Sequence, residues 1–165
     1  MKTLTPSRII KSLVLFIVLV AADLVTKALA ASRLGTPLPL INNVLEFHYL
    51  ENHGAAFSLL QDARVFFIII TAIFLAVALY VLIKVPNTRR FLLMRLTILV
   101  IMAGAVGNLV DRIVFGYVRD FIYFSLIDFP IFNVADIYVS VGVAVLVLLI
   151  LFVYKNEDFD FLSLK

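Results

Sequence analysis

Residues 9–29 read IIKSLVLFIVLVAADLVTKAL, a mostly apolar run in which Asp23 and Lys27 stand close to the far end. A helix that crosses the ~30 Å hydrocarbon core of a bilayer needs roughly 20 such residues. Three further apolar runs follow at about 65–83, 91–110 and 137–154. The sequence therefore predicts an all-α membrane protein with four transmembrane helices, forming one integral membrane domain over residues 1–165.

The composition excludes several other classes of protein. Of the 165 residues, 64% are hydrophobic and 15% are charged, whereas soluble domains average roughly 45–50% apolar and 25% charged residues. The chain has no cysteine, which excludes thiol catalysis and a disulfide-stapled fold. It has no basic block of the kind that binds nucleic acid. We therefore expect membrane lipid, and no nucleic acid, among its partners.

The basic residues indicate an orientation in the membrane. Four spans place both termini on one side, and nine of the 14 lysines and arginines fall on that side, against five on the other. Basic residues concentrate on the cytoplasmic side of membrane proteins. We expect a multi-pass protein with both termini in the cytoplasm and two long connections outside.

A cleavable signal peptide is the alternative interpretation of the first run. Basic residues precede it, and Ala28-Leu29-Ala30 is similar to a cleavage site. Asp23 and Lys27 interrupt the region just before that site, which favours a retained transmembrane helix.

The two long connections differ in pattern. In residues 31–64, turn residues surround the short alternating stretch Glu46–Tyr49, which predicts a small strand-containing extracytoplasmic segment on the membrane surface. Residues 111–136 are rich in Phe and Tyr, which is typical of the membrane interface.

Polar residues are expected to meet near the outer ends of the spans. Asp111 follows Asn108 at the end of the third span, and Asp136 follows Asn133 at the start of the fourth. Asp120 lies 16 residues before Asp136 and could fold back to the same level. Because ionisable groups at membrane depth are costly, such a set usually has a function.

Each of these residues also has a purely structural interpretation. Asp23 and Lys27, one helical turn apart, could form only a structural ion pair. Asp136 could be an N-cap, Arg112 a residue reaching to the interface, and Asp120 a solvated loop acid.

The residue types exclude some catalytic mechanisms and leave two possible functions for the aspartates. The sequence has neither a His-Glu-x-x-His zinc motif nor a Gly-x-Ser-x-Gly motif, and nothing marks His48 or His53 as the base of a nucleophilic Ser58 or Ser125. Two neighbouring aspartates share a proton, so one can activate water while the other protonates a leaving group. The alternative is a small proton- or cation-coupled membrane transporter, although such proteins favour acids at the midplane and an internal repeat.

Five short blocks carry a more specific signal. They are Asp23-Leu-Val-Thr-Lys27, Asn52-His-Gly-Ala-Ala-Phe57, Gly104-Ala-Val-Gly-Asn-Leu-Val-Asp-Arg112, Val118-Arg-Asp-Phe121 and Phe132-Asn-Val-Ala-Asp136. In this order the blocks resemble the lipoprotein signal peptidase family, bacterial signal peptidase II. The resemblance implies an aspartic endopeptidase that needs no metal or organic cofactor, with Asp120 and Asp136 as its catalytic pair.

The resemblance also implies a substrate and a location. The substrate is a prolipoprotein bearing a diacylglyceryl-cysteine, and the signal peptide is removed by cleavage before that cysteine. The enzyme is expected in the bacterial cytoplasmic (inner) membrane as a monomer, with its active site near the outer face.

Further residues match the family's supporting positions. The polar lining is expected to consist of Asn52, Gly54, Asn108, Arg112 and Asn133. Asp23 and Lys27 are expected to support the first span, and Asp111 to support the site beside Arg112. Spacing alone leaves Asp111 and Asp120 as alternatives for the catalytic pair, and only the resemblance favours Asp120.

Two departures from the family and one group of aromatic residues complete the expectations. Ala103 stands where a glycine is usual, and Arg119 where the residue is often apolar; neither is expected to touch the catalytic pair. Phe57, with residues 121–124, is expected to cover the site and exclude water.

Overall fold

Four long helices form the body of the protein in the computed structural model, which describes residues 6–54 and 63–162. They are α1 (Pro6–Arg33), α2 (Arg64–Lys84), α3 (Leu92–Val114) and α4 (Val134–Phe152). All four are long and apolar enough to cross a membrane. The predicted four-span fold is confirmed.

Two helix ends lie beyond the predicted spans, and at both ends the additional residues include polar ones. The third helix continues through Asp111 and Arg112 to Val114, and the fourth begins at Val134 instead of Ile137. Hydropathy marks only the apolar part of a helix, whereas backbone hydrogen bonding continues into the polar turns. Asp111 and Asp136 therefore both lie within helices, close to their ends.

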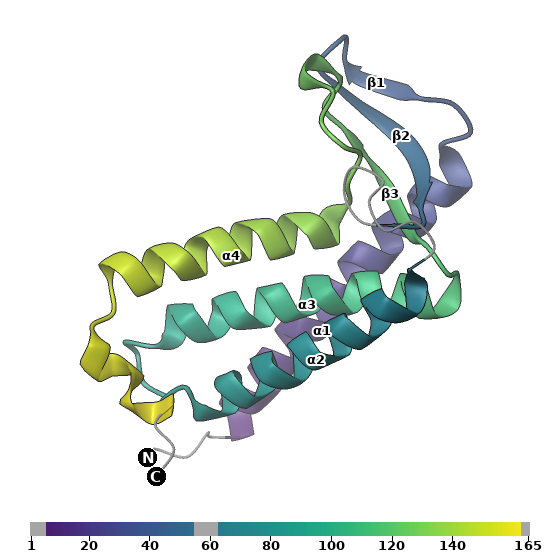
Figure 1. Cartoon of the computed structure of the whole chain (residues 1–165). Helices are drawn as coiled ribbons and strands as arrows, with labels where there is room; N and C mark the ends of the chain where they lie inside the picture. Colours follow the sequence, from purple (N-terminus) through teal and green to yellow (C-terminus); the bar gives the residue numbers. More distant parts are fainter. Residues whose placement is uncertain (1–5, 55–62, 163–165) are drawn as a thin grey trace.

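Helix α3 is the central helix of the bundle and contacts each of the other three (Figure 1). Half of the residues in the most apolar 18-residue stretch of α3 are buried inside the protein, whereas none are buried in the corresponding stretch of α2. Gly104 permits close packing on α4, since a Cβ atom there would lie 2.5 Å from the carbonyl oxygen of Ala135. Ala103, the first departure from the family pattern, is fully buried in the same helix. Small residues therefore set the spacing between the helices.

A three-stranded antiparallel sheet stands at one end of the bundle, and α1 begins and α4 ends at the opposite end (Figure 1). The strands are β1 (Leu38–Ile41), β2 (Leu45–Asn52) and β3 (Val118–Tyr123), in that order across the sheet. The turn between β1 and β2 uses Asn43 at φ 59°, a backbone conformation that asparagine tolerates. The predicted strand-containing segment is confirmed, and β2 is longer than the predicted stretch.

The third strand was not predicted. Residues Val118, Arg119, Asp120 and Phe121 are all buried, so β3 does not show the alternation of polar and apolar residues that marks a half-exposed strand. Its pairing with β2 brings a segment after α3 beside a segment before α2. The strand thereby joins the two long connections, residues 31–64 and 111–136, which the sequence analysis treated as separate segments.

The end of the bundle opposite the sheet has its own apolar core. Phe91 stacks on Tyr154 with ring centroids 5.2 Å apart, and Val85 and Leu149 are buried in the same cluster. A short helix, η3 (Asn156–Leu162), follows α4, and Arg90 forms an ion pair there with Asp158. This core holds the end of the bundle opposite the sheet.

Gly104→Ala should destabilise the protein by about 1–3 kcal/mol, because the added methyl group would push α4 away from α3. The measurement is the midpoint of thermal unfolding in detergent. Gly35→Ala is the matched control, since no atom lies within 4 Å of a Cβ built at Gly35. Equal midpoints for the two variants would contradict the close-packing interpretation.

Candidate active site

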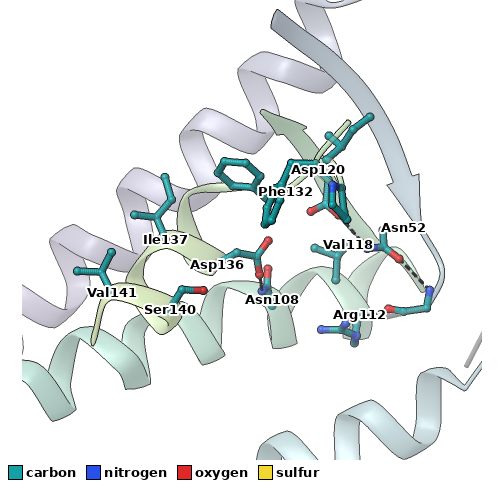
Figure 2. Close-up of a pocket in the computed structure, with 14 residues that line it drawn as sticks. Asn52, Asn108, Arg112, Val118, Asp120, Phe132, Asp136, Ile137, Ser140 and Val141 are labelled. Atoms are coloured by element: carbon teal, nitrogen blue, oxygen red, sulfur yellow. Dashed lines mark hydrogen bonds between the residues drawn. The ribbon is translucent and has the colours of Figure 1, made fainter. Parts of the chain in front are cut away.

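A cavity of about 420 Å³ lies where the sheet meets α3 and α4 (Figure 2). Two carboxylates line it, Asp120 from β3 and Asp136 from the first turn of α4. Its other polar lining residues are Asn52, Asn108, Arg112 and Ser140. The structure thus brings together, in one cavity, both aspartates of the predicted catalytic pair.

Asp120 is held by amide groups from two other segments. The side-chain nitrogen of Asn52 donates a hydrogen bond to one carboxylate oxygen at 2.9 Å, and that of Asn133 donates to the other at 2.6 Å.

The backbone nitrogens of Phe121 and Ile122 both donate to the carbonyl oxygen of Phe132. This pairing folds the chain between β3 and α4 back on itself, as the spacing of Asp120 and Asp136 had suggested.

Asp136 is fixed by a capping box at the start of α4. The side chain of Asn133 accepts from the Asp136 backbone nitrogen at 3.0 Å, and the Asp136 carboxylate accepts from the Asn133 backbone nitrogen at 3.1 Å. Asn108 donates to the other oxygen of Asp136 at 2.8 Å. The N-cap is therefore Asn133, and the alternative that made Asp136 the N-cap is wrong.

Two asparagines connect the two carboxylates. Asn133 donates to Asp120 and also to the side-chain oxygen of Asn108, at 3.1 Å, while Asn108 donates to Asp136. The result is a continuous chain of hydrogen bonds from Asp120 through both amides to Asp136. Because every link is a specific donor and acceptor, the chain fixes the orientation of both carboxylates.

The Asp23–Lys27 pair reaches this network from α1. The fully buried Lys27 ammonium lies 2.8 Å from the Asp23 carboxylate and donates to the side-chain oxygen of Asn108 at 2.8 Å. Asp23 also accepts from the backbone nitrogen of Ala135 at 2.8 Å, in the first turn of α4. The predicted ion pair exists, and it touches the site through Asn108.

Gly107 makes the approach of Asp23 possible. A Cβ atom at Gly107 would overlap the Asp23 carboxylate, so α1 and α3 can meet at this level only because the residue has no side chain. The close contact brings the charged pair of α1 to the polar end of α3.

Asp111 forms an ion pair that the sequence analysis did not predict. Its carboxylate binds the Arg119 guanidinium at 2.6 Å and the Arg119 backbone nitrogen at 2.9 Å. Lys27 lies 3.7 Å from it on the other side. The buried Asp111 thus fixes the start of β3 one residue before Asp120, and it is not part of the cavity lining.

Arg112, on α3, forms a hydrogen bond with the segment that follows β2. It donates to the carbonyl oxygen of Gly54 at 3.3 Å, and its guanidinium lies 4.7 Å from the centre of the Phe67 ring. It also lines the cavity. These contacts do not fit the alternative in which Arg112 merely reaches to the interface.

Burial changes the acidity of Asp120. Loss of water around the side chain, followed by the nearby charge of Asp136, raises the pKa of Asp120 to about 7 from an ordinary value of 3.8. Hydrogen bonds from Asn52 and Asn133 oppose the shift. The carboxyl group of Asp120 can therefore hold a proton near neutral pH.

Some lining residues were missed from the sequence. Ser140 lies one helical turn after Asp136, so helical spacing was the available signal. Phe132 lines the cavity and stacks on Phe124, 5.8 Å away. Phe57, expected to cover the site, lies outside the described residues.

The remaining candidate residues lie elsewhere or outside the described chain. His48 packs on the ring of Tyr123, and His53 on that of Tyr117, at 6.1 and 5.2 Å between ring centres. Ser58 lies outside residues 6–54 and 63–162. Within those ranges, no group of three or more His, Asp or Glu side chains is arranged to hold a metal ion.

Comparison with known proteins identifies the family. The model of the family described as signal peptidase (SPase) II matches residues 15–152. The chain belongs to the signal peptidase II family. The resemblance that the five sequence blocks indicated is confirmed.

The names of sequence relatives agree with signal peptidase II membership. Two proteins of Streptococcus pyogenes named lipoprotein signal peptidase, from serotype M5 (strain Manfredo) and serotype M3 (strain SSI-1), are 42% and 41% identical over 129 residues. Each match covers 77% of this chain and 84% of the relative.

Two bacterial membrane enzymes solved by the in meso method have a similar structure. The one at 2.3 Å resolution is 36% identical, with a TM-score of 0.76, over 86% of this chain and 87% of that one. The one at 1.9 Å resolution is 34% identical, with a TM-score of 0.77, over 87% of this chain and 94% of that one. The signal peptidase II chain thus shares its fold with membrane enzymes.

Arg119→Leu should lower the free energy of unfolding by about 3 kcal/mol, because it leaves the buried Asp111 carboxylate with Lys27 as its remaining cationic neighbour. Denaturation in detergent, followed for Arg119→Leu, Asp111→Asn and the double variant, measures the coupling. A double variant whose loss equals the sum of the single losses would show that the pair is not coupled.

Proposed function

We propose that this chain is an aspartic endopeptidase that removes the signal peptide from diacylglyceryl-modified prolipoproteins, with Asp120 and Asp136 as its catalytic residues. The observation that carries the proposal is the chain of hydrogen bonds through Asn133 and Asn108 that joins the two carboxylates in one cavity. Membership of the signal peptidase II family supports the reaction. The relatives named lipoprotein signal peptidase support the class of substrate.

The proposed mechanism uses one aspartate as base and the other as acid. The base takes a proton from a water molecule, whose oxygen attacks the carbonyl carbon before the lipidated cysteine. The acid then gives its proton to the cysteine nitrogen as the carbon–nitrogen bond breaks. The products are a signal peptide with a new carboxyl terminus and a lipoprotein with a free amino group. The raised pKa of Asp120 supports its role as the group that carries the shared proton.

Arg112 and Asn52 have supporting roles in this proposal. Arg112 lines the cavity with a permanent positive charge, which suits an oxyanion that develops on the scissile carbonyl. Asn52 links Asp120 to the loop at Gly54, because it donates to Asp120 and accepts from the Gly54 nitrogen at 3.0 Å. Both residues therefore orient groups around the reacting atoms.

The substrate's signal helix is proposed to enter sideways from the bilayer. A second cavity of about 310 Å³ shares Asn108, Arg112 and Asp136 with the first and continues along α2 to Phe74. Apolar lining suits a signal helix, and the lipid chains of the substrate can stay in the bilayer. The excess of basic residues near the termini supports an inner-membrane orientation with cytoplasmic termini and a site near the outer face.

Asp120→Asn and Asp136→Asn should each reduce cleavage at least about 100-fold, because an amide can neither take up nor release the proton. The measurement is a gel-shift assay of purified protein with a diacylglyceryl-modified prolipoprotein. Asp128→Asn is the matched control, since Asp128 is exposed and bonds to Tyr123 away from the cavity.

The outcomes of that assay test both the catalytic pair and the peptidase activity. Retained activity in either site variant removes that residue from the catalytic pair. If the folded wild-type protein does not cleave, the peptidase proposal fails, and proton or cation flux in liposomes then tests the transporter alternative.

The specificity constant, kcat/KM, should fall as the pH rises through about 7, because the proton on the aspartate pair is lost there. The pKa of Asp120 is raised by folding, so the neutral acid is the form present below this pH. Asn52→Ala should move this alkaline limb to higher pH, since the Asn52 hydrogen bond opposes the shift. A limb that stays in place, whatever the absolute rate, would contradict the assignment.

A further inference from the structure

A separate cavity of about 500 Å³ lies at the opposite end of the bundle from the active site, where α1 and α3 begin. The first turns of α1 and α3 and the connection between α2 and α3 form its walls. Four cations line it: Arg8, Lys11, Arg89 and Arg95. Among the described residues, its lining includes no carboxylate. We call it the basic cavity.

The basic cavity changes from charged to apolar along the helices. On α1, Arg8 and Lys11 are followed on the same helix face by Leu15, and on α3, Arg95 is followed by Leu99. The charged residues lie near the helix starts and the leucines lie deeper in the spans. The cavity thus combines a cationic mouth with an apolar wall at the depth of a lipid chain.

Two of its cations are held in place by other groups. Arg8 donates to the side-chain oxygen of Asn87 at 2.9 Å. Arg95 donates to the carbonyl oxygens of Leu82 and Val85, at 3.1 and 2.9 Å, and so caps the end of α2. None of these partners carries a negative charge, so the positive charge of both guanidinium groups remains.

The like charges in the basic cavity repel one another. Arg8 from α1 and Arg95 from α3 line the same cavity. Arg90, at the same end of the bundle, lies instead in an ion pair with Asp158 and does not line the cavity. An anion in the basic cavity would relieve a repulsion that the described protein residues leave in place.

We propose that the basic cavity binds the phosphate headgroup of an anionic phospholipid from the leaflet at the end of the bundle opposite the sheet. The cations contact the phosphate, and the leucines contact the first part of an acyl chain. A phospholipid fits because the mouth lies at the ends of the spans and the wall lies within them. The site is separate from the catalytic pair and does not depend on the proposed peptidase activity.

The test is a lipid titration by native mass spectrometry of the purified full chain in detergent. The probe is dioleoyl phosphatidylglycerol, with dioleoyl phosphatidylcholine as the zwitterionic comparison. Lys11→Gln/Arg89→Gln should weaken phosphatidylglycerol binding at least about tenfold, since both residues lie at the mouth. Lys11→Arg/Arg89→Lys should restore it.

The matched control is Lys84→Gln/Lys155→Gln, which removes the same charge outside the lining of the basic cavity. This control should keep its affinity within about twofold. An equal loss in both double variants would assign the effect to general surface charge and overturn the proposal. Because Lys11 and Arg89 are exposed, the variants are expected to fold, and an unchanged elution volume and unfolding midpoint verify this.

Two competitors separate a lipid from a free phosphate. Inorganic phosphate and glycerol 3-phosphate at millimolar concentration should leave phosphatidylglycerol bound, because neither contacts the apolar wall. Complete displacement by either would identify a site for soluble phosphate and overturn the lipid assignment. Asp120→Asn should bind phosphatidylglycerol as the wild type does, so the outcome is independent of the peptidase test.

Discussion

The site depends on the neutralisation of a buried ammonium group. Lys27 is fully buried in the bundle, where an unpaired charge would cost several kcal/mol. Asp23 supplies the opposite charge, and Asn108 supplies a hydrogen-bond acceptor. Since these partners come from α1 and α3, and Asp23 also binds the first turn of α4, this charged group joins three helices at one level. The amide chain that orients both aspartates begins at the same place.

Asparagine is suited to this arrangement because its amide both donates and accepts. The side-chain oxygen of Asn133 accepts a hydrogen bond from the Asp136 backbone nitrogen. Its side-chain nitrogen donates to Asn108 and to Asp120. Asn108 works in the same way between Lys27 and Asp136. Neutral amides can therefore separate and orient two carboxylates without adding charge to a buried site. The buried pair Asp111–Arg119 then fixes the strand from which Asp120 projects.

The sequence predicted the parts of this structure that follow from burial in lipid. Twenty-residue apolar runs and the scarcity of charged residues within them located the four helices and the level of the polar cluster. Strand β3 could not be found in the same way, because both its faces are buried and its charged pair carries no periodic pattern. The Asp111–Arg119 pair was not predicted, because Asp111 lies in α3 and Arg119 in β3, and only the packing of that strand brings them together. The role of Asn133 as the N-cap depends on backbone geometry that hydropathy does not report.

The bond between Asp23 and the backbone nitrogen of Ala135 joins positions that lie 112 residues apart. One partner lies in α1 and the other lies in the first turn of α4. Asp136 lies in the same turn of α4 as Ala135, so it reaches its bonded position beside Asp120 only when α4 has docked on α1 and α3. A membrane protease built in this way owes its site to the packing of helices from distant parts of the sequence, and no single segment of the chain contains that site.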